Sequence, residues 1–341
     1  MIRVLVAEDS GTARGLLVEI LRSDPEIEIV GQARDGTQAV ALTRELRPDL
    51  VTMDIHMPSM DGFEATQEIM NVSPTPIVIV SGLSQMTESE TVARALGAGA
   101  LAVLRKPEGP SAPSFAKTAR ELIVTVKAMS QVKVVRHRHE WASPERRPAV
   151  ARRVGRVVAI ATSTGGPAAL NCLLPALPEN FPAPILVVQH ITPGFVGGLA
   201  SALDSACKIR VKVAEHGERL RAGTAYLAPD GRHLRAATDR TVVLSLEPPV
   251  GGFRPAGSVL FESVAQAFGP GTIALILTGM GSDGVTGLRS VRSRGGRVIA
   301  QDEESSVVFG MPQAAIAAGL ADQVVALEAI PSRVAGLIFG D

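Results

Sequence analysis

Three residues whose side chains could together perform nucleophilic catalysis lie far apart in the second half of the chain. Ser163, His190 and Asp283 each follow a run of aliphatic and β-branched residues. Such runs are typical of central strands in parallel sheets, and the carboxyl ends of these strands form the ligand crevice of open α/β folds. A hydroxyl nucleophile, an imidazole base and a carboxylate are the groups that acyl transfer needs. The sequence therefore predicts a Ser-His-Asp site at one edge of a sheet.

Taken singly, each of these residues has a simpler interpretation. Ser163 could cap a helix or bind a phosphate, His190 could be a core histidine, and Asp283 could be a turn residue. Because all three follow predicted strands of one sheet, we favour the triad. Three residues among shorter strands and turns are weaker candidates for the same roles: His216, Asp230 and His233.

The segment around Ser163 has the composition of a tight turn between a strand and a helix. Gly165 and Gly166 allow the backbone to pass close to a substrate, and Pro167 suits the first position of a helix. Amides at such a helix start would face a developing negative charge. The segment is not a Gly-x-Ser-x-Gly sequence, so it differs from the nucleophile turn of α/β-hydrolases.

Polar residues also follow the predicted strands of the first half. Clustered carboxylates at neighbouring strand ends would repel one another unless a cation bound there, and Mg²⁺ uses one or two carboxylates together with water and phosphate oxygens. A hydroxyl and an ammonium at the same rim suit a phosphoryl group. The residues are Glu8, Asp9, Asp54, Ser81 and Lys106.

The run from Asp54 to Gly62, with Glu8-Asp9, Ser81 and Lys106-Pro107, resembles the receiver domain of two-component response regulators over about residues 1–127. The resemblance implies that Asp54 accepts a phosphoryl group from a chemotaxis histidine kinase. It also implies that Glu8, Asp9 and Asp54 hold Mg²⁺ and that Ser81 and Lys106 sense the phosphoryl group. Val103 departs from the family pattern, because many receivers carry an aromatic switch residue there.

Five segments of the second half together form a distinctive set: Ala161–Pro167, Gln189-His190, Leu227–Pro229, Thr278–Gly284 and Ser306–Pro312. In these segments the second half resembles the chemotaxis protein-glutamate methylesterases of the CheB family, over about residues 154–338. A receiver followed by a linker is that family's usual arrangement.

This second resemblance implies a role for each residue of the site. Ser163 would be the nucleophile, His190 the general base and then general acid, and Asp283 the group that orients the imidazole. The backbone amides of Thr164 and Met280 would be the oxyanion donors. The substrate would be a γ-glutamyl methyl ester on a methyl-accepting chemoreceptor, with deamidation of some glutamines as a related activity. No cofactor is expected at this site.

The elements expected to position these residues alternate between strand and helix in both halves, which predicts an α/β fold. We expect a doubly wound, five-stranded parallel receiver domain at residues 1–127 and a basic linker at 128–153. A mainly parallel methylesterase domain with an antiparallel edge would follow at 154–341. That edge is expected from short strands at Arg210–Val213, Thr224–Leu227 and Thr241–Leu246.

Composition narrows the choice of partners. The chain has 341 residues and 34 residues of each charge sign, so its net charge is zero and predicts neither nucleic-acid binding nor an anionic membrane partner. No apolar run approaches the length of a membrane span. Two distant cysteines, Cys172 and Cys207, fit buried thiols. We therefore expect a cytoplasmic protein without membrane insertion.

Three other functions are compatible with parts of the pattern. A response regulator with a DNA-binding output would need a late helix-turn-helix pattern, which the second half lacks. A nucleotide-binding domain using Thr162–Pro167 would need a P-loop lysine, which does not follow. The third is a receiver-controlled, non-catalytic interaction module in a chemosensory pathway. The presence of Ser163, His190 and Asp283 disfavours it.

Overall fold

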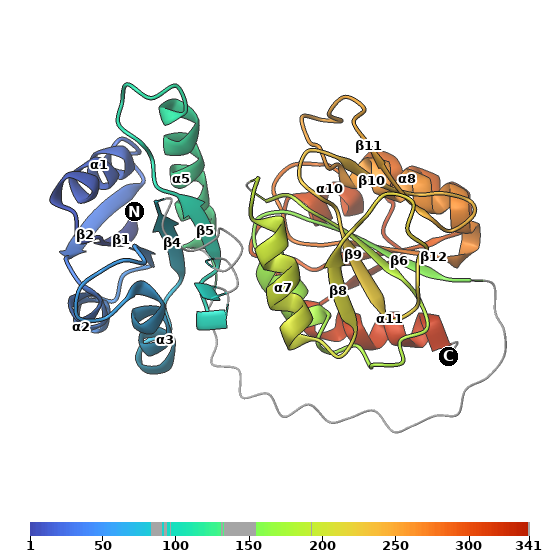
Figure 1. Ribbon diagram of the computed structural model, residues 1–341, viewed down its shortest axis with the longest axis horizontal. Helices are drawn as coiled ribbons and strands as arrows, with labels where there is room; N and C mark the ends of the chain where they lie inside the picture. The colour runs from blue at the N-terminus through green and yellow to red at the C-terminus, as the bar shows by residue number, and fades with distance from the viewer. Residues whose placement is uncertain are drawn as a thin grey trace. The chain divides into compact units, whose positions relative to one another are not determined.

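The computed structural model describes residues 1–82, 91, 94–95, 97–130, 132, 155–191 and 193–339. The chain divides into two compact units, Met1–Ser143 and Pro144–Asp341, which run from blue to teal and from green to red in Figure 1. Of the expected linker at 128–153, residue 131 and residues 133–153 lie outside the described residues.

The first unit is a five-stranded parallel sheet with the strand order β2-β1-β3-β4-β5, as expected for a doubly wound fold. Helix α1 packs with α5, and α2 packs with α3 (Figure 1). The described elements are β1 (Ile2–Ala7), α1 (Gly11–Arg22), β2 (Ile27–Ala33), α2 (Gly36–Leu46), β3 (Leu50–Met53), α3 (Gly62–Val72), β4 (Ile77–Ser81), β5 (Ala102–Arg105) and α5 (Phe115–Met129).

The strands at the centre of the first unit are buried on both faces, which explains why their sequences are continuous apolar runs. All four residues of β3 and all five of β4 are buried, because helices lie over the sheet and leave neither face to water. The order places β1 beside β3, so the residues that follow these two strands emerge next to each other. The topology thus brings the first group of carboxylates to one rim.

The second unit is built on a seven-stranded parallel sheet with the order β14-β13-β12-β6-β7-β9-β8. Its elements are β6 (Val157–Thr162), α6 (Gly166–Leu173), β7 (Ile185–Gln189), α7 (Val196–Ala206), β8 (Arg210–Val213), β9 (Thr224–Leu227), β10 (His233–Ala236), β11 (Val242–Ser245), α8 (Gly257–Phe268), β12 (Thr272–Ile276), α9 (Val285–Ser293), β13 (Arg297–Gln301), α10 (Met311–Ala317), β14 (Gln323–Val325) and α11 (Ile330–Phe339).

Strand β6 lies at the centre of this sheet and is buried along its whole length. Val157, Ala159 and Ala161 pack in one cluster with residues of α8 and α9. The alternate residues Val158 and Ile160 are also buried, on the opposite face of the strand. Two helix layers produce this double burial: α8 packs with α9 and α9 with α10, while α6 packs with α7.

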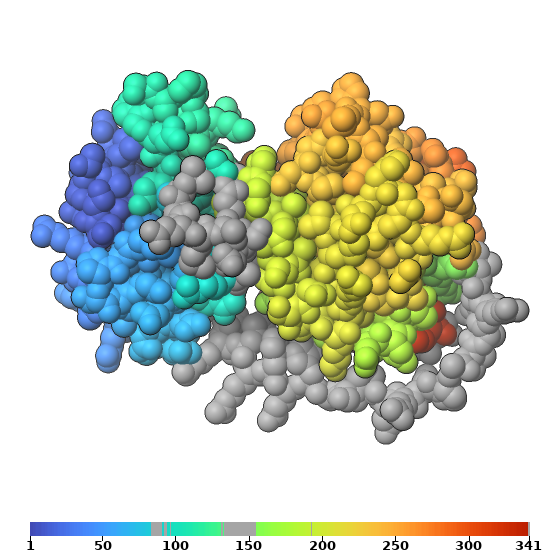
Figure 2. Space-filling view, viewed as in Figure 1, coloured from blue at the N-terminus to red at the C-terminus, as the bar shows by residue number. Residues whose placement is uncertain are grey.

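Antiparallel pairing is present in the second unit as expected, but it involves two strands, and only the predicted segment Thr241–Leu246 takes part in it, as β11. Strands β10 and β11 form a separate two-stranded antiparallel sheet. The segments Arg210–Val213 and Thr224–Leu227 instead extend the main sheet as parallel strands. Strands this short carry too little sequence pattern to fix their direction. The close spacing of short strands along the chain was therefore not enough to predict an antiparallel arrangement. Figure 2 shows the yellow and orange segment that contains β10 and β11 on the surface of the second unit.

Among the described residues, no helix combines the length and the apolar character that crossing a bilayer requires.

Candidate active site and phosphorylation site

Ser163 directly follows β6, between the strands that lead to the other two predicted triad members. Its backbone N–H donates to the carbonyl of Thr278, which follows β12, at 3.0 Å. The side-chain Nε2 of Gln189, the last residue of β7, donates to the backbone carbonyl of Ser163 at 2.8 Å. The turn that carries the hydroxyl is therefore attached to the ends of both neighbouring strands.

His190 directly follows β7 and pairs with Asp283. Its Nε2 lies 2.9 Å from Oδ2 of Asp283, and its backbone N–H donates to the carbonyl of Thr162 at 3.0 Å. The other ring nitrogen, Nδ1, is buried and has no hydrogen-bond partner within the described part of the chain. Since an ionised carboxylate only accepts, Nε2 carries a hydrogen, and in the neutral imidazole Nδ1 is then the acceptor.

Asp283 is a buried carboxylate held by backbone amides. Oδ2 accepts from the N–H of Gly257 at 2.5 Å, and Oδ1 accepts from Ser258 at 3.0 Å and from Gly284 at 2.8 Å. Burial alone would raise the pKa of Asp283, but the hydrogen bonds from His190 and from these amides lower it below the usual value. The geometry keeps this carboxylate ionised beside the imidazole.

The two residues predicted to supply oxyanion amides, Thr164 and Met280, are both next to hydrogen bonds made by the turn Thr278-Gly279. The hydroxyl of Thr278 donates to the carbonyl of Thr164 at 2.9 Å and accepts from the N–H of Val308 at 2.9 Å. Gly279, directly before Met280, donates to the carbonyl of Val308 and accepts from the N–H of Met311. The side chain of Met280 is exposed. The backbones of both predicted donors are thus fixed by neighbouring segments.

The weaker triad candidates have other partners in the structure. His233 is fully buried, with Nδ1 accepting from the N–H of Ala256 at 3.2 Å and Nε2 lying 3.1 Å from the carbonyl of Pro248. Nδ1 of His216 accepts from the N–H of Leu244. Asp230 accepts from the N–H of Gly194. All three are bonded to backbone groups instead of to a hydroxyl nucleophile.

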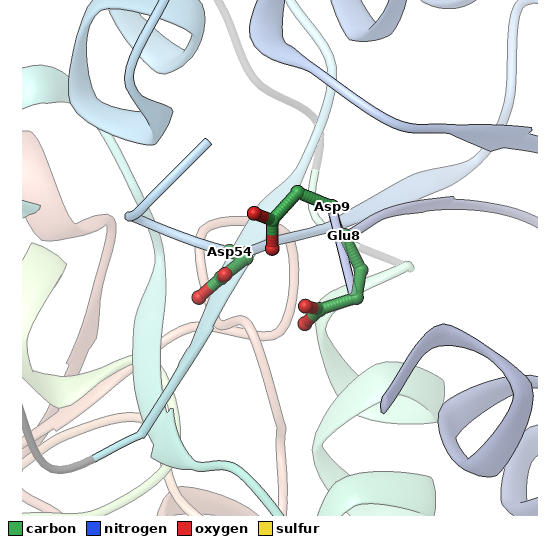
Figure 3. Close-up of side chains that lie close together, drawn as sticks. All are labelled: Glu8, Asp9 and Asp54. Carbon is green, nitrogen blue, oxygen red and sulfur yellow. The ribbon is translucent and has the colours of Figure 1, made fainter. Parts of the chain in front are cut away.

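The three predicted metal ligands of the first unit lie together at the rim of its sheet. One carboxylate oxygen from each of Glu8, Asp9 and Asp54 lies within 4.8 Å of the others. Figure 3 shows these three side chains close together. Glu8 and Asp54 are buried, whereas Asp9 is exposed. Burial raises the pKa of Glu8, although the Lys106 ammonium opposes that rise.

Lys106 reaches the same cluster from the end of β5. Its Nζ lies 2.6 Å from Oε2 of Glu8 and 3.2 Å from Oδ2 of Asp54. Burial would lower the pKa of Lys106, but the two carboxylates outweigh that effect and raise it. Ser81 ends β4 at the same rim, and its hydroxyl donates to the carbonyl of Gly82 at 3.1 Å. The rim thus combines three carboxylates with one ammonium and one hydroxyl.

The donor set of this rim fits a hard divalent cation. All three ligands are carboxylates, one is open to water, and their oxygens lie close enough to share an ion. The contact of Lys106 with two of them shows that the cluster attracts positive charge.

The two cysteines are free and half-buried. Burial raises the pKa of the Cys172 thiol to about 11 and that of Cys207 to about 12. Both remain protonated at neutral pH, so neither is a candidate nucleophile.

Sequence analysis assigned no role to four residues that support the site, although one of them, Thr278, lies in a segment that carries the family resemblance. The ring of Phe253 stacks on His190 with centroids 4.0 Å apart and planes 5° apart. Gly257 and Ser258 donate to Asp283, and Thr278 joins the turns around Ser163. The Gly251-Gly252 pair before Phe253 was the available signal, because it marks a tight turn.

Comparison with known proteins assigns both halves of the chain. Residues 158–334 match the CheB methylesterase family, and residues 4–112 match the response regulator receiver domain. The chain belongs to the CheB methylesterase family. It is 52% identical to protein-glutamate methylesterase/protein-glutamine glutaminase 4 of Myxococcus xanthus strain DK1622, over 99% of this chain and 98% of the relative.

Two further relatives agree with this assignment. The chain is 54% identical to protein-glutamate methylesterase/protein-glutamine glutaminase 3 of Anaeromyxobacter dehalogenans strain 2CP-C, over 98% of each chain. Among solved structures it is similar to the CheB methylesterase catalytic domain of Thermotoga maritima, with 44% identity and a TM-score of 0.53. That match covers 54% of this chain and 99% of the other.

Proposed function

We propose that this protein is a protein-glutamate methylesterase that hydrolyses γ-glutamyl methyl esters on methyl-accepting chemoreceptors and is activated by phosphorylation of its receiver. The observation that carries the proposal is the His190–Asp283 pair beside the Ser163 turn, with Nδ1 of His190 buried and unpaired within the described residues. The proposed domains are the receiver at 1–127, the linker at 128–153 and the methylesterase at 154–341.

In the proposed reaction, the hydroxyl oxygen of Ser163 attacks the ester carbonyl while Nδ1 of His190 takes its proton. The negative charge that develops on the carbonyl oxygen would be held by the amides of Thr164 and Met280. Asp283 stabilises the imidazolium through Nε2. When the tetrahedral intermediate collapses, the bond to the methoxy oxygen breaks, and His190 returns the proton so that methanol leaves.

The second half of the cycle repeats the chemistry with water. His190 removes a proton from water, the resulting hydroxide attacks the acyl carbonyl, and the Ser163 oxygen leaves as it regains a proton. The receptor is released with a free γ-carboxylate. Glutamine deamidation follows the same steps with ammonia as the leaving group, and it depends more strongly on proton donation by His190.

In the receiver, Asp54 would accept the phosphoryl group of a chemotaxis histidine kinase. One carboxylate oxygen of Asp54 forms a bond to phosphorus as the bond to the donor nitrogen breaks. Mg²⁺ held by Glu8, Asp9 and Asp54 would neutralise the charge that gathers there. Lys106 would then pair with the phosphoryl oxygens, and the Ser81 hydroxyl would donate to them.

The test of this function is methanol release from membranes that contain methylated chemoreceptors. The wild-type chain, Ser163→Ala and Asp54→Ala are compared side by side, with and without a small phosphodonor. We expect release by the wild type, no release by Ser163→Ala, and no response of Asp54→Ala to the phosphodonor. Circular dichroism of each variant confirms that it is folded.

If the wild type releases no methanol from any methylated receptor, with or without phosphodonor, the esterase function is wrong. The non-catalytic interaction module would then be the better interpretation. That alternative predicts phosphodonor-dependent binding to chemosensory partners, and the binding would be insensitive to Ser163→Ala.

A further inference from the structure

The segment between β11 and α8, residues 246–256, forms a strap next to the His190–Asp283 pair. Its tip is a two-residue hairpin in which Val250 and Phe253 exchange backbone hydrogen bonds of 3.0 Å each. Gly251 and Gly252 at the turn both have positive φ, 60° and 87°, as in the type I′ hairpins that favour glycine. The strap therefore has a defined conformation.

Both ends of the strap are fixed to one buried histidine. Nδ1 of His233 accepts from the N–H of Ala256, and Nε2 faces the carbonyl of Pro248. The guanidinium of Arg254 adds a second attachment, since it donates to the carbonyls of Leu246 and Glu247 at 3.0 and 3.2 Å. These bonds close residues 248–256 into a loop whose tip has little freedom to move.

The fixed strap brings an aromatic ring onto the catalytic imidazole. Phe253 and His190 are nearly parallel, with planes 5° apart and centroids 4.0 Å apart. The residues that follow the strap, Gly257 and Ser258, donate their amides to Asp283. A single stretch of chain thus contacts both members of the pair, the imidazole through a ring face and the carboxylate through two N–H groups.

We propose that Phe253 is a positioning residue, which holds the plane of the His190 ring and stabilises its imidazolium form during the reaction. A cation over an aromatic face is attracted by the ring quadrupole when it lies within about 6 Å of the centroid. The neutral imidazole gains much less from this contact. Because His190 becomes charged only after it takes the Ser163 proton, the stacked ring favours that state.

The stacking acts together with Asp283, which is the ionisable side chain that bonds His190 among the described residues. Asp283 fixes the position of Nε2 through its hydrogen bond. Nε2 lies close to the axis of rotation about the Cβ–Cγ bond, so this hydrogen bond restrains the tilt of the ring only weakly, and a flat ring on the face opposes that tilt. With both restraints, Nδ1 keeps a constant direction. The kinetic consequence of this inference rests on the proposed esterase function. The effect of Phe253 on protonation of the His190 ring does not.

The experiment compares the full-length wild type with Phe253→Leu, which keeps an apolar side chain but removes the ring, and Phe253→Tyr, which restores the ring. The imidazole Cε1–H signals are followed by NMR against pH, and His190→Gln identifies the His190 signal. For Phe253→Leu we expect the pKa of His190 to fall by roughly half a pH unit. Phe253→Tyr should titrate as the wild type does.

Methanol release gives the kinetic readout. We expect kcat/KM of Phe253→Leu to fall about three- to tenfold, mainly through kcat, with the acid limb of its pH profile moved to lower pH. Phe253→Tyr should regain most of the rate. The matched control is Phe339→Leu, the same substitution at an exposed phenylalanine in α11, which should change neither the titration nor the rate.

An unchanged His190 titration in Phe253→Leu overturns the proposal, whatever the rate. A loss of rate with an unchanged titration would show that Phe253 is only a packing residue. If the wild type itself released no methanol, the proposed esterase function would fail, and the NMR comparison would still decide the role of Phe253.

Discussion

At the scale of single residues, Asp283 shows how a buried charge is kept beside the imidazole of His190, the proposed general base. An isolated carboxylate in such a position would be protonated, because burial penalises its charged form. Three backbone amides and His190 supply the hydrogen bonds that water would otherwise provide. The carboxylate therefore stays ionised and its pKa lies below the usual value.

Asp283→Asn is expected to lower kcat strongly while the protein remains folded. The replacement keeps the size of the side chain, but its amide no longer fixes the ring tautomer or stabilises the imidazolium. The corresponding change in a serine protease lowers kcat about 10⁴-fold. The measurement is single-turnover methanol release beside Ser163→Ala. A rate within a factor of about ten of the wild type would mean that Asp283 has no catalytic role.

The same carboxylate predicts a pH dependence of stability. Since the folded-state pKa of Asp283 is lowered from the ordinary 3.8, its contribution is present above pH 3.8 and is lost as pH falls through the lower folded value. Urea unfolding of the wild type and of Asp283→Asn at a series of acidic pH values measures the contribution of this carboxylate to the free energy of unfolding. We expect the difference in unfolding free energy to shrink below pH 3.8. A constant difference would contradict the ionised carboxylate.

Thr278 makes a separate prediction, because its hydroxyl joins the Thr164 carbonyl to the Val308 amide. Thr278→Val keeps the shape but removes both hydrogen bonds, and it leaves the half-buried carbonyl of Thr164 and N–H of Val308 to find other partners. We expect kcat to fall about tenfold or more with little change in KM, since the proposed oxyanion amides lose support. Thr278→Ser should restore most of the activity. Equal losses in both variants would exclude this role of the hydroxyl.

At the scale of elements, the site depends on close approach between the turns after β6 and β12. A Cβ on Gly279 would lie 2.6 Å from Cβ of Ser163 and 2.6 Å from Sδ of Met311. The Ser163 side chain has no room to withdraw, because its backbone is bonded to the neighbouring strand end. Only glycine allows the two turns to remain in contact.

Gly279→Ala is therefore expected to lose most of the esterase activity and to be destabilised by about 1–3 kcal/mol. Methanol release and thermal unfolding together measure the two effects. The control is Gly336→Ala in α11, where a Cβ meets no atom within 4 Å. That variant should be fully active and slightly more stable, because alanine favours a helix by about 0.5–1 kcal/mol over glycine. Normal activity in Gly279→Ala would refute the close approach.

The elements also show what could be predicted from sequence. The strands before Ser163, His190 and Asp283 were predictable, because double burial leaves a continuous apolar run and parallel order gathers the strand ends. The direction of β8 and β9 was not, since strands of only four residues show no decisive period.

The support of the site was not predictable for a different reason. The contacts of Phe253, His233 and Thr278 join segments that are distant in sequence. Their residue types fit many other environments, and the Gly251-Gly252 turn before Phe253 marks a tight turn without indicating what its neighbour contacts. His233 illustrates the difficulty. A histidine is a common catalytic residue, but the ring of this one is buried and holds a loop through the backbone of Pro248 and Ala256.

At the scale of the whole molecule, the chain combines a receiver domain with an acidic rim in one unit and a methylesterase domain in the other. A change at the first can alter the second only if the two units interact differently in the two phosphorylation states. The rim provides a clear difference in charge, because Lys106 now contacts Glu8 and Asp54. A phosphoryl group on Asp54 would add negative charge and compete for that ammonium.

If the phosphoryl group takes Lys106 from the carboxylates, the phosphodonor should act on esterase activity only through Asp54 and a divalent cation. In the full-length chain, a small phosphodonor with Mg²⁺ should raise the rate of methanol release. Chelating the metal should abolish the increase, since carboxylates that share no ion with the phosphate repel it. Asp54→Asn should also lose the response, and Lys106→Met should weaken it. Inorganic phosphate serves as the control for ionic effects, and continued stimulation of Asp54→Asn would place the regulatory phosphorylation elsewhere in the molecule.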